Sequence, residues 1–277
     1  MVTDERAYEV PDRDRAPIPL DRWDCDSGAV DSYADQGGAA AMRPRLLDLF
    51  CGGGGAAEGY ARAGWDVVGI DIDPQPAYPY AFVEADAMEV LKQHLGDYDA
   101  IHASPPCQPY SKAVSSSSSE WNDTKGKDEP ALIEPLRELL LATGLPYVIE
   151  NVMAAPLDGI VLCGSMFGLD IPRHRRFESN KHLSPLPHPN CHGIAKAAAE
   201  RRGWEYRDMS VTGKGRHAGW GERARELLGI EHPMRQHDYK EAIPPAYTEH
   251  IGRQLKWYVP AYAKWQADLR WTEEAAL

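Results

Sequence analysis

Short apolar runs alternate with stretches of helical period along residues 45–149. The apolar runs predict strands at 46–50, 65–70, 81–83, 98–103 and 146–149, and the helical period predicts helices ending at Ala63, at 87–94 and at 130–142. Strands that alternate with helices are joined by right-handed crossovers and form parallel sheets. The pattern therefore predicts an α/β fold with a doubly wound, largely parallel sheet, which binds ligands at the carboxyl ends of its strands.

The segments around this region have a different pattern. Residues 1–41 show no period and few large apolar side chains, which predicts a disordered or loosely attached tail. Residues 178–240 are rich in Pro, Gly, His and Arg, which predicts a small irregular region, and helical period returns from Pro245 to Trp257. We therefore expect four parts, at 1–41, 42–177, 178–240 and 241–277, the last returning to the sheet domain.

The composition is that of an ordinary globular protein. Of the 277 residues, 43% are hydrophobic and 26% are charged. No apolar run approaches the roughly 18 residues that span a membrane, and the N-terminus lacks the pattern of a secretory signal. We expect a cytoplasmic protein that does not contact membranes.

The cysteines favour neither disulfides nor zinc. There are five, an odd count with wide spacing, and no Cys-x-x-Cys pair occurs. One local group, His182, His188, Cys191 and His192, has side chains of the ligand type, but its spacing matches no standard zinc pattern. We therefore predict a solvent-exposed loop there and no metal site.

Charge is distributed unevenly along the chain. The formal net charge of −12 argues against a protein that simply coats nucleic acid. Residues 1–41 carry a net −6, whereas residues 172–216 carry a net +6 and four histidines besides. A basic stretch inside an acidic protein fits a nucleic-acid footprint, and it fits a solvated loop as well.

A glycine-rich turn, Asp-Leu-Phe-Cys-Gly-Gly-Gly-Gly at 48–55, joins the first predicted strand to the first helix. Glycines at such a turn bring bare N–H groups and a helix N-terminus against a ligand. Asp71 or Asp73, after the second strand, can accept hydrogen bonds from ribose hydroxyls. Together these features predict an adenosine-containing cofactor, either a dinucleotide or S-adenosylmethionine. Asp86, after the third strand, could bind the adenine amino group or cap a helix.

Three later motifs carry reactive side chains. Cys107 follows the fourth strand in Ser-Pro-Pro-Cys-Gln-Pro, where prolines predict a rigid extended loop, and an exposed cysteine near a basic group can be a nucleophile. Glu150 ends the fifth strand in Glu-Asn-Val, beside the Cys107 loop if the two strands are neighbours. A carboxylate there is costly without partners or a function. Residues 171–177 add a cationic cluster, which by itself would be a solvated charge run.

These motifs, in this order, resemble the DNA (cytosine-5) methyltransferase family over about residues 45–178 and more weakly over 225–255. The resemblance implies the Rossmann-like fold of S-adenosylmethionine-dependent methyltransferases, with 42–177 as the catalytic and cofactor-binding domain and 178–240 as the target-recognition region. It implies methyl transfer to carbon 5 of a cytosine flipped out of double-stranded DNA, through a covalent Cys107 adduct. The short insertion looks most like that of compact phage-type members. We expect a monomer in the cytoplasm of a bacterial cell or phage-infected host.

The resemblance also implies a role for each residue that matches a motif. Cys107 would attack ring carbon 6, Glu150 would hold or protonate ring nitrogen 3, and Arg175 would stabilise the base carbonyl and raise the thiolate fraction. The residues that would bind the cofactor are Phe50, Gly52, Gly54, Asp71, Ile72, Asp86 and Pro106. The residues that would contact DNA are Gln108, Ser111, Arg173 and Arg176, with the loop from Tyr110 to Lys127 closing over the duplex.

Three features depart from the family pattern. The Gln-x-Arg-x-Arg motif appears as Arg-His-Arg-Arg-Phe at 173–177, the acidic residue after the second strand is Asp71 rather than Glu, and the Gly-Asn pair falls on Lys240-Glu241. Lys240 could favour a donor that bears an extra carboxylate, or it could pair with Glu241. Two alternatives therefore stay open, a modified S-adenosylmethionine donor and a non-catalytic DNA-binding relic. A nicotinamide oxidoreductase would explain the glycine turn but not the Cys107 and Glu150 motifs.

Overall fold

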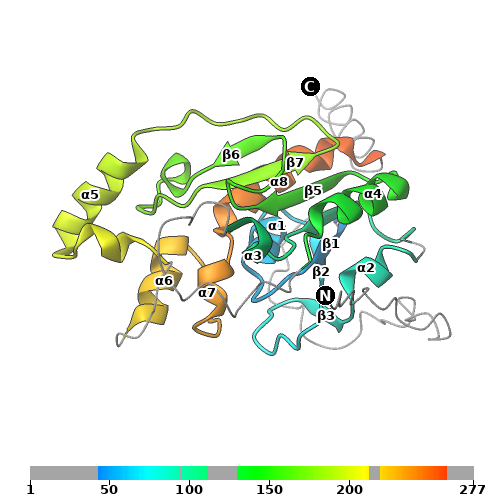
Figure 1. Ribbon diagram of the computed structural model, residues 1–277, viewed down its shortest axis with the longest axis horizontal. Helices are drawn as coiled ribbons and strands as arrows, with labels where there is room; N and C mark the ends of the chain where they lie inside the picture. The colour runs from blue at the N-terminus through cyan, green and yellow to red at the C-terminus, as the bar shows by residue number, and fades with distance from the viewer. Residues whose placement is uncertain (1–42, 94, 112–129, 212–218, 261–277) are drawn as a thin grey trace, which may run out of the picture. The chain divides into compact units, whose positions relative to one another are not determined.

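A computed structural model of the chain describes residues 43–93, 95–111, 130–211 and 219–260, and these are built on one seven-stranded sheet (Figure 1). The strand order is β3-β2-β1-β4-β5-β7-β6. Strands β1 to β5 are parallel, and β7 runs antiparallel to both β5 and β6. The strands are β1 Arg45–Leu49, β2 Asp66–Asp71, β3 Ala81–Glu84, β4 Ala100–Ala103, β5 Tyr147–Asn151, β6 Ile160–Leu162 and β7 Arg175–Ser179.

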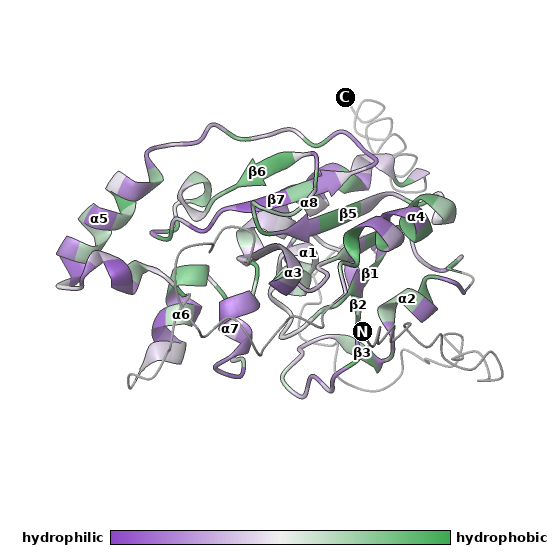
Figure 2. Cartoon of the chain, viewed as in Figure 1, coloured by the Kyte–Doolittle hydropathy of each residue, from purple (hydrophilic) through white to green (hydrophobic). Residues whose placement is uncertain are grey.

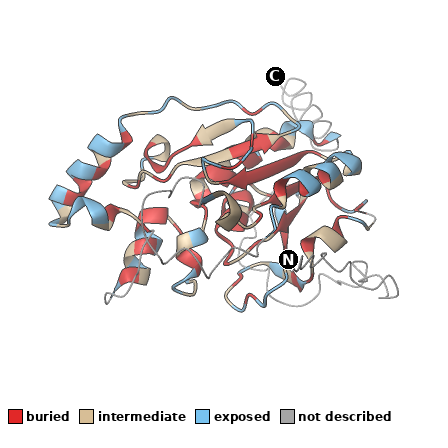
Figure 3. Cartoon of the chain, in the orientation of Figure 1, coloured by how far each residue is buried: buried red, intermediate tan, exposed pale blue. Residues whose placement is uncertain are grey.

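The doubly wound α/β prediction is confirmed, and β1 to β5 lie where the apolar runs placed them. Strands β4 and β5 are neighbours in the sheet and are buried along their whole length, as Figure 3 shows for the centre of the fold. Strands β6 and β7 were not predicted. Strand β6 has three residues, and β7 begins with Arg175 and Arg176, whose charges hide the strand from a hydropathy pattern.

The helices flank this sheet. They are α1 Gly55–Arg62, α2 Ala87–Val90, α3 Gln108–Ser111, α4 Ile133–Thr143 and α8 Pro245–Leu255, with 3₁₀ turns η4 at Gly164–Phe167 and η6 at Lys256–Tyr258. Figure 2 shows hydrophobic residues on central strands such as β5, while α4 carries both hydrophobic and hydrophilic residues.

Helix α8 returns the end of the chain to the first helix, as the sequence predicted. A Cβ atom on Gly59 of α1 would come within 2.0 Å of the Pro245 carbonyl oxygen, so only glycine allows this approach. The Thr248 hydroxyl donates to the Ala56 carbonyl at 2.8 Å, and the Trp65 indole donates to the Gly252 carbonyl at 3.0 Å. These buried hydrogen bonds fix α8 against α1.

Residues 178–240 form a helical region rather than the irregular one expected. The region contains α5 Cys191–Arg202, the 3₁₀ turn η5 Tyr206–Met209, α6 Trp220–Leu228 and α7 Asp238–Glu241. Helix α5 is rich in alanine and arginine and has no apolar stripe, which is why its period is hard to see in the sequence. Its buried alanines pack with Met209, Trp220 and Leu228 in a small separate core.

Two expected features lie outside the described residues. One is the tail at 1–41, and the other is most of the loop from Tyr110 to Lys127. None of the helices in the described part of the chain has the length and hydrophobicity to cross a membrane.

Candidate active site

The carboxyl ends of β1, β2, β4 and β5 surround one cavity of about 380 Å³, within the size range of small-molecule sites. Segment 235–243, which precedes α8, forms its opposite wall. Of the residues singled out in the sequence, the cavity is lined by Phe50, Gly52, Asp71, Ile72, Pro106, Cys107, Gln108, Glu150 and Arg175. Its lining does not include Gly54, Asp86, Ser111, Arg173 or Arg176.

The glycine turn has an unusual backbone. Phe50 adopts a left-handed conformation with φ 57°, and Gly52 follows with φ 49°. The Gly52 N–H donates to the Asp71 Oδ2 atom at 2.9 Å, which links the ends of β1 and β2. A Cβ atom on Gly52 would have no atom within 4 Å, so this backbone faces open space in the cavity. Gly54 has φ 89° and packs against Tyr78, so its role is to shape the turn.

Asp48 is a site residue that the pattern analysis missed. It lies within β1, its side chain is fully buried, and it lines the cavity. Its Oδ2 accepts a hydrogen bond from the Tyr78 hydroxyl at 3.3 Å, while Oδ1 has no partner among the described residues. Burial raises the pKa of Asp48 to about 8, a rise that the Tyr78 bond opposes and the charge of Asp71 reinforces. The signal in the sequence that could have identified Asp48 is a charged residue within an otherwise apolar strand.

Asp86 caps a helix, which is one of the two roles that its position in the sequence allowed. Its Oδ1 accepts from the Met88 N–H at 2.7 Å and from the Glu89 N–H at 3.3 Å, which makes it the N-cap of α2. These contacts and its absence from the cavity lining favour the cap over the expected adenine contact.

The wall opposite the sheet comes from a segment that carried no clear motif. Arg235 donates to Asp238 Oδ2 at 2.9 Å and also bonds to Gln75 and the Pro74 carbonyl, so it ties this segment to the turn after β2. A Cβ atom on Gly53 would lie 3.0 Å from the side chain of Asp238, which shows how closely the wall approaches the glycine turn. Sequence reasoning singled out Lys240 and Glu241 but not the rest of this wall, whose residues lie more than 150 positions from the turn.

The Cys107 loop is held at both ends. The Asn151 side-chain amide donates to the Pro105 carbonyl at 2.8 Å in a buried bond, so the residue after Glu150 fixes the loop. The Ser111 hydroxyl donates to the Cys107 carbonyl at 3.0 Å as α3 begins. Burial raises the pKa of the Cys107 thiol, although Ser111 and Arg175 oppose the rise. The expectation of a lowered pKa is therefore wrong for the unliganded protein, because desolvation outweighs the nearby cation.

Glu150 and Arg175 form the central ion pair of the cavity. Glu150 Oε1 lies 3.0 Å from Arg175 Nε, and both side chains are largely buried. Burial raises the pKa of Glu150, against the lowering effects of Arg175, Arg173 and a hydrogen bond from Ser104. A carboxyl group with a raised pKa takes up a proton more readily, which suits it to donate a hydrogen bond to a ring nitrogen.

A buried polar chain supports Glu150 from beneath the sheet edge. His102 in β4 is fully buried, with Nδ1 3.0 Å from the Tyr60 hydroxyl and Nε2 2.8 Å from the Ser104 hydroxyl. Burial lowers the pKa of His102 to about 3, so its ring is neutral at physiological pH. Because Ser104 also bonds to Glu150, the chain runs from Tyr60 to the cavity. The histidine lies in a short apolar strand, and nothing in the sequence marked it.

The two arginines expected to contact DNA differ in how far they are buried. Arg173 is buried and donates to the Lys240 carbonyl at 2.7 Å, a position that does not favour the predicted contact with DNA. Burial lowers its pKa to about 9. Arg176 is partly exposed and donates to the Leu157 carbonyl at 3.0 Å. Gln108 lines the cavity, and its buried Oε1 has no partner among the described residues.

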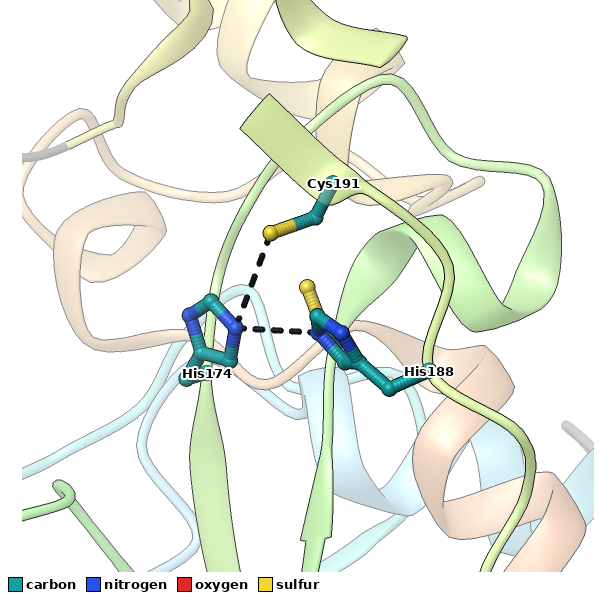
Figure 4. A group of neighbouring side chains, drawn as sticks. His174, His188 and Cys191 are labelled. Carbon is teal, nitrogen blue, oxygen red and sulfur yellow. Dashed lines mark hydrogen bonds between the residues drawn. The ribbon is translucent and has the colours of Figure 1, made fainter. Parts of the chain in front are cut away.

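The three histidines and the cysteine expected in one exposed loop have different neighbours in the structure. The carbonyl of His182 accepts from the Tyr258 hydroxyl, and the ring of His192 contacts the Tyr206 hydroxyl. His188 and Cys191 instead meet His174, as Figure 4 shows, and Cys163 belongs to the same group. The expected solvent-exposed loop is therefore wrong for Cys191, which is buried.

The sheet order and the cavity define an α/β protein with a cavity at the carboxyl edge of its sheet. Residues 44–138, which carry the glycine turn and the Cys107 loop, match the family of C-5 cytosine-specific DNA methylases. The family resemblance of the motifs is thereby confirmed for this segment.

Individual relatives agree with the family match. The chain is 33% identical over 90 residues to the Type II methyltransferase M.FnuDI of Fusobacterium nucleatum, which covers 30% of this chain and 26% of that protein. The chain thus matches about a quarter of the length of this relative.

Solved structures share the fold. The Dnmt2 methyltransferase of S. pombe superposes with a TM-score of 0.50 at 13% identity, over 79% of this chain and 100% of that one. A putative DNA modification methyltransferase encoded within a prophage of E. coli gives a TM-score of 0.47 at 15% identity, over 78% and 99% of the two chains. The methyltransferase fold predicted from the motifs is therefore confirmed.

Proposed function

We propose that this chain is an enzyme that transfers a methyl group from S-adenosylmethionine to carbon 5 of cytosine in double-stranded DNA. The observation that carries the proposal is the placement of Cys107, Glu150 and Arg175 in one cavity, with Glu150 and Arg175 paired at 3.0 Å. A nucleophile, a carboxyl acid and a cation are the three groups that addition to a cytosine ring requires. The family match of residues 44–138 supports the same chemistry.

Each residue has a defined task in this reaction. Cys107, as the thiolate, forms a bond to ring carbon 6 of a flipped cytosine, while Glu150 donates a hydrogen bond or proton to ring nitrogen 3. Arg175 holds the Glu150 carboxyl in place and offers its guanidinium N–H groups to the base carbonyl. S-adenosylmethionine supplies the methyl group to carbon 5. Loss of the proton from carbon 5 then allows Cys107 to leave as a thiolate, which restores the double bond.

The cavity fits such a cofactor. Gly52 faces open space, and the buried Asp48 Oδ1 has no partner among the described residues, so a ligand with donors would satisfy it. Asp71, beside the exposed Ile72, would receive the ribose hydroxyls, and Phe50 would stack on the adenine. The carboxylate of Asp71 complements a cationic sulfonium.

DNA would enter from the side of α3 and the recognition region. Gln108 presents a side-chain amide in the cavity beyond Cys107, and Ser111 lies exposed on the next turn. The net +6 charge of residues 172–216 supports attraction to phosphates despite the overall negative charge. Arg176 rather than Arg173 is then the candidate contact from the cationic cluster.

The alternative of a modified methyl donor depends on the position of Lys240. It lines the cavity, but its Nζ lies 5.8 Å from the centre of the Trp220 ring, in the geometry of a cation–π contact. This contact engages the ammonium group, which supports our proposal of the ordinary methyl donor rather than one with an added carboxylate.

Incubation of the purified chain with DNA and methyl-labelled S-adenosylmethionine tests the proposal. We expect label in DNA, 5-methylcytosine in a nucleoside digest, and a stable protein–DNA adduct with 5-fluorocytosine. Cys107→Ala should give none of these, and Cys25→Ala, the same change at another cysteine, should give all three. Labelled DNA from Cys107→Ala would overturn the mechanism, and a heavier cytosine adduct would establish a different donor. DNA binding without any transfer by the unaltered chain would establish the non-catalytic relic.

A further inference from the structure

Two cysteines and two histidines from three segments of the chain meet at the edge of the sheet. Cys163 follows β6, His174 precedes β7, His188 lies in the connection after β7, and Cys191 is the first residue of α5. One potential ligand atom from each residue lies within 4.8 Å of those of the other three. Figure 4 shows His174, His188 and Cys191 directed toward one another.

The separations match those around a tetrahedral zinc ion. His174 Nε2 lies 3.1 Å from His188 Nε2 and 3.8 Å from Cys191 Sγ. Zinc–nitrogen and zinc–sulfur bond lengths in a tetrahedron place two nitrogens about 3.3 Å apart and a nitrogen and a sulfur about 3.6 Å apart. These two separations are within a few tenths of an ångström of the tetrahedral values, and the other separations in the group are at most 4.8 Å.

The surroundings are those of a structural site. Cys163 and Cys191 are both buried and both free thiols, and the Ser165 hydroxyl donates to Cys163 Sγ at 3.4 Å. Cys191 also lies at the N-terminus of a twelve-residue helix, whose dipole favours a thiolate. Four protein ligands complete the coordination shell, so the ion would have no open position for a substrate.

We propose that Cys163, His174, His188 and Cys191 form a structural Zn²⁺ site that fastens the start of α5 to the β6–β7 edge of the sheet. The spacing, Cys-x10-His-x13-His-x2-Cys, differs from common zinc modules because two ligands come from the sheet and two from the following connection. His188 and Cys191 are the two ligands that lie close together in the sequence.

The site would link the recognition region to the catalytic residues. His174 is adjacent to Arg175, and the Arg175 guanidinium donates to the His174 carbonyl at 2.9 Å. An ion that holds His174 therefore also holds the backbone next to the partner of Glu150. Helix α5, the first helix of the region at 178–240, would be fixed at the other side of the same ion.

The metal content of the full-length chain, purified without chelators, tests this proposal. We expect about one equivalent of zinc by mass spectrometry, lost in His188→Ala and in Cys191→Ser. His192→Ala changes the next residue outside the group and should keep the zinc. His188 is exposed, so its variant should keep the fold, which circular dichroism checks.

Cobalt provides a second measurement that does not depend on enzymatic activity. Addition of Co²⁺ to the zinc-free chain should produce the intense visible bands of a tetrahedral ion and a thiolate charge-transfer band. Ser165→Ala should keep these bands and weaken zinc affinity about tenfold, because a hydrogen bond to one ligand is lost. Absence of zinc together with absence of the cobalt bands in the unaltered chain would overturn the proposal, as would zinc retained in both ligand variants.

Discussion

Glu150 and Arg175 face each other from neighbouring strands that run in opposite directions, with Oε1 and Nε 3.0 Å apart. The last residues of β5 pair with the first residues of β7, Glu150 opposite Phe177 and Asn151 opposite Arg176. The carboxyl end of a parallel strand thereby meets the beginning of an antiparallel one. This topology brings an acid and a cation from distant motifs to one edge of the sheet.

The first prediction concerns this pair. Glu150→Gln keeps the shape of the side chain but cannot protonate a ring nitrogen, so the rate of methyl transfer should fall by about 10²- to 10⁴-fold. Thermal unfolding should change little. Arg175→Ala should instead lower the free energy of unfolding by about 3–5 kcal/mol, because it leaves a buried carboxylate unpaired. Equal stability of Arg175→Ala and the unaltered chain would show that the pair is not held in solution.

The second prediction concerns the pH dependence of the Cys107 reaction. Because burial raises the pKa of this thiol, its thiolate fraction is small at neutral pH and grows as the pH rises. The single-turnover rate should therefore increase toward alkaline pH. Alkylation of Cys107 by iodoacetamide, followed by mass spectrometry, should show the same trend without DNA or cofactor. A rate of alkylation that does not change between neutral and alkaline pH would contradict the raised pKa.

The third prediction separates the position of the Cys107 loop from its chemistry. Asn151→Ala removes the buried hydrogen bond to the Pro105 carbonyl and leaves that oxygen unsatisfied, at a cost of about 1–3 kcal/mol. Methyl transfer and 5-fluorocytosine trapping should both decrease, while the affinity for S-adenosylmethionine, measured by calorimetry, changes little. Asn180→Ala removes an exposed amide that bonds to Leu145 and is the matched control.

The fourth prediction is a loss of stability above neutral pH. The pKa of Asp48 is about 8 in the folded chain. The folded chain therefore holds a proton there that the unfolded chain releases above about pH 4. The free energy of unfolding that this proton contributes is lost as the pH rises from about 4 to 8. His102, with a pKa of about 3, has the opposite effect below about pH 6.5, because there the unfolded chain binds the extra proton. The two effects cancel between about pH 4 and 6.5.

Between pH 6.5 and 8 the Asp48 effect is no longer offset by His102. The Asp48 contribution to the free energy of unfolding should fall there by about 2 kcal/mol, from a slope of about 1.4 kcal/mol per pH unit. Denaturant unfolding at the two pH values, compared between the unaltered chain and the variants below, measures it. Asp48→Asn should abolish the fall, whereas Asp73→Asn, a change at an exposed carboxylate on the same cavity, should not.

The fifth prediction concerns residues 1–41. Their low apolar content and net charge of −6 predict that they contribute nothing to the core and repel DNA. A chain that begins at Met42 should fold, methylate DNA and bind it more tightly at low salt, and the difference should vanish as salt rises. Loss of solubility or activity would show that the tail packs on the sheet domain.

Local motifs account for much of the fold and the cavity. The glycine turn, Asp71 and the Cys107 loop follow strands that could be read from apolar runs, so their convergence at one sheet edge was predictable. Arg175 was identified only through resemblance, because β7 begins with charged residues that do not look like a strand. The burial of Arg173, two positions earlier, could not be predicted, since it depends on contact with the distant Lys240 carbonyl.

Other parts of the site depend on contacts between residues far apart in the sequence. Asp48 and His102 lie inside buried strands, where hydropathy alone gives no role to a single polar residue. The Cys163 and His174 side chains are eleven positions apart, and only the antiparallel pairing of β6 and β7 brings them together. The sequence grouped His182 and His192 with the cluster because they are close along the chain.

The docking of α8 on α1 has a consequence for synthesis on the ribosome. The hydroxyl of Thr248 reaches the carbonyl of Ala56 across 192 positions, and the cavity wall at 235–243 is attached to the same helix. A nascent chain can form β1 to β5 early, but it cannot close the cofactor cavity until about residue 255 has emerged from the exit tunnel. Closing so long a loop is entropically slow, so we expect the cavity to form only after the segment at 235–255 has been synthesised.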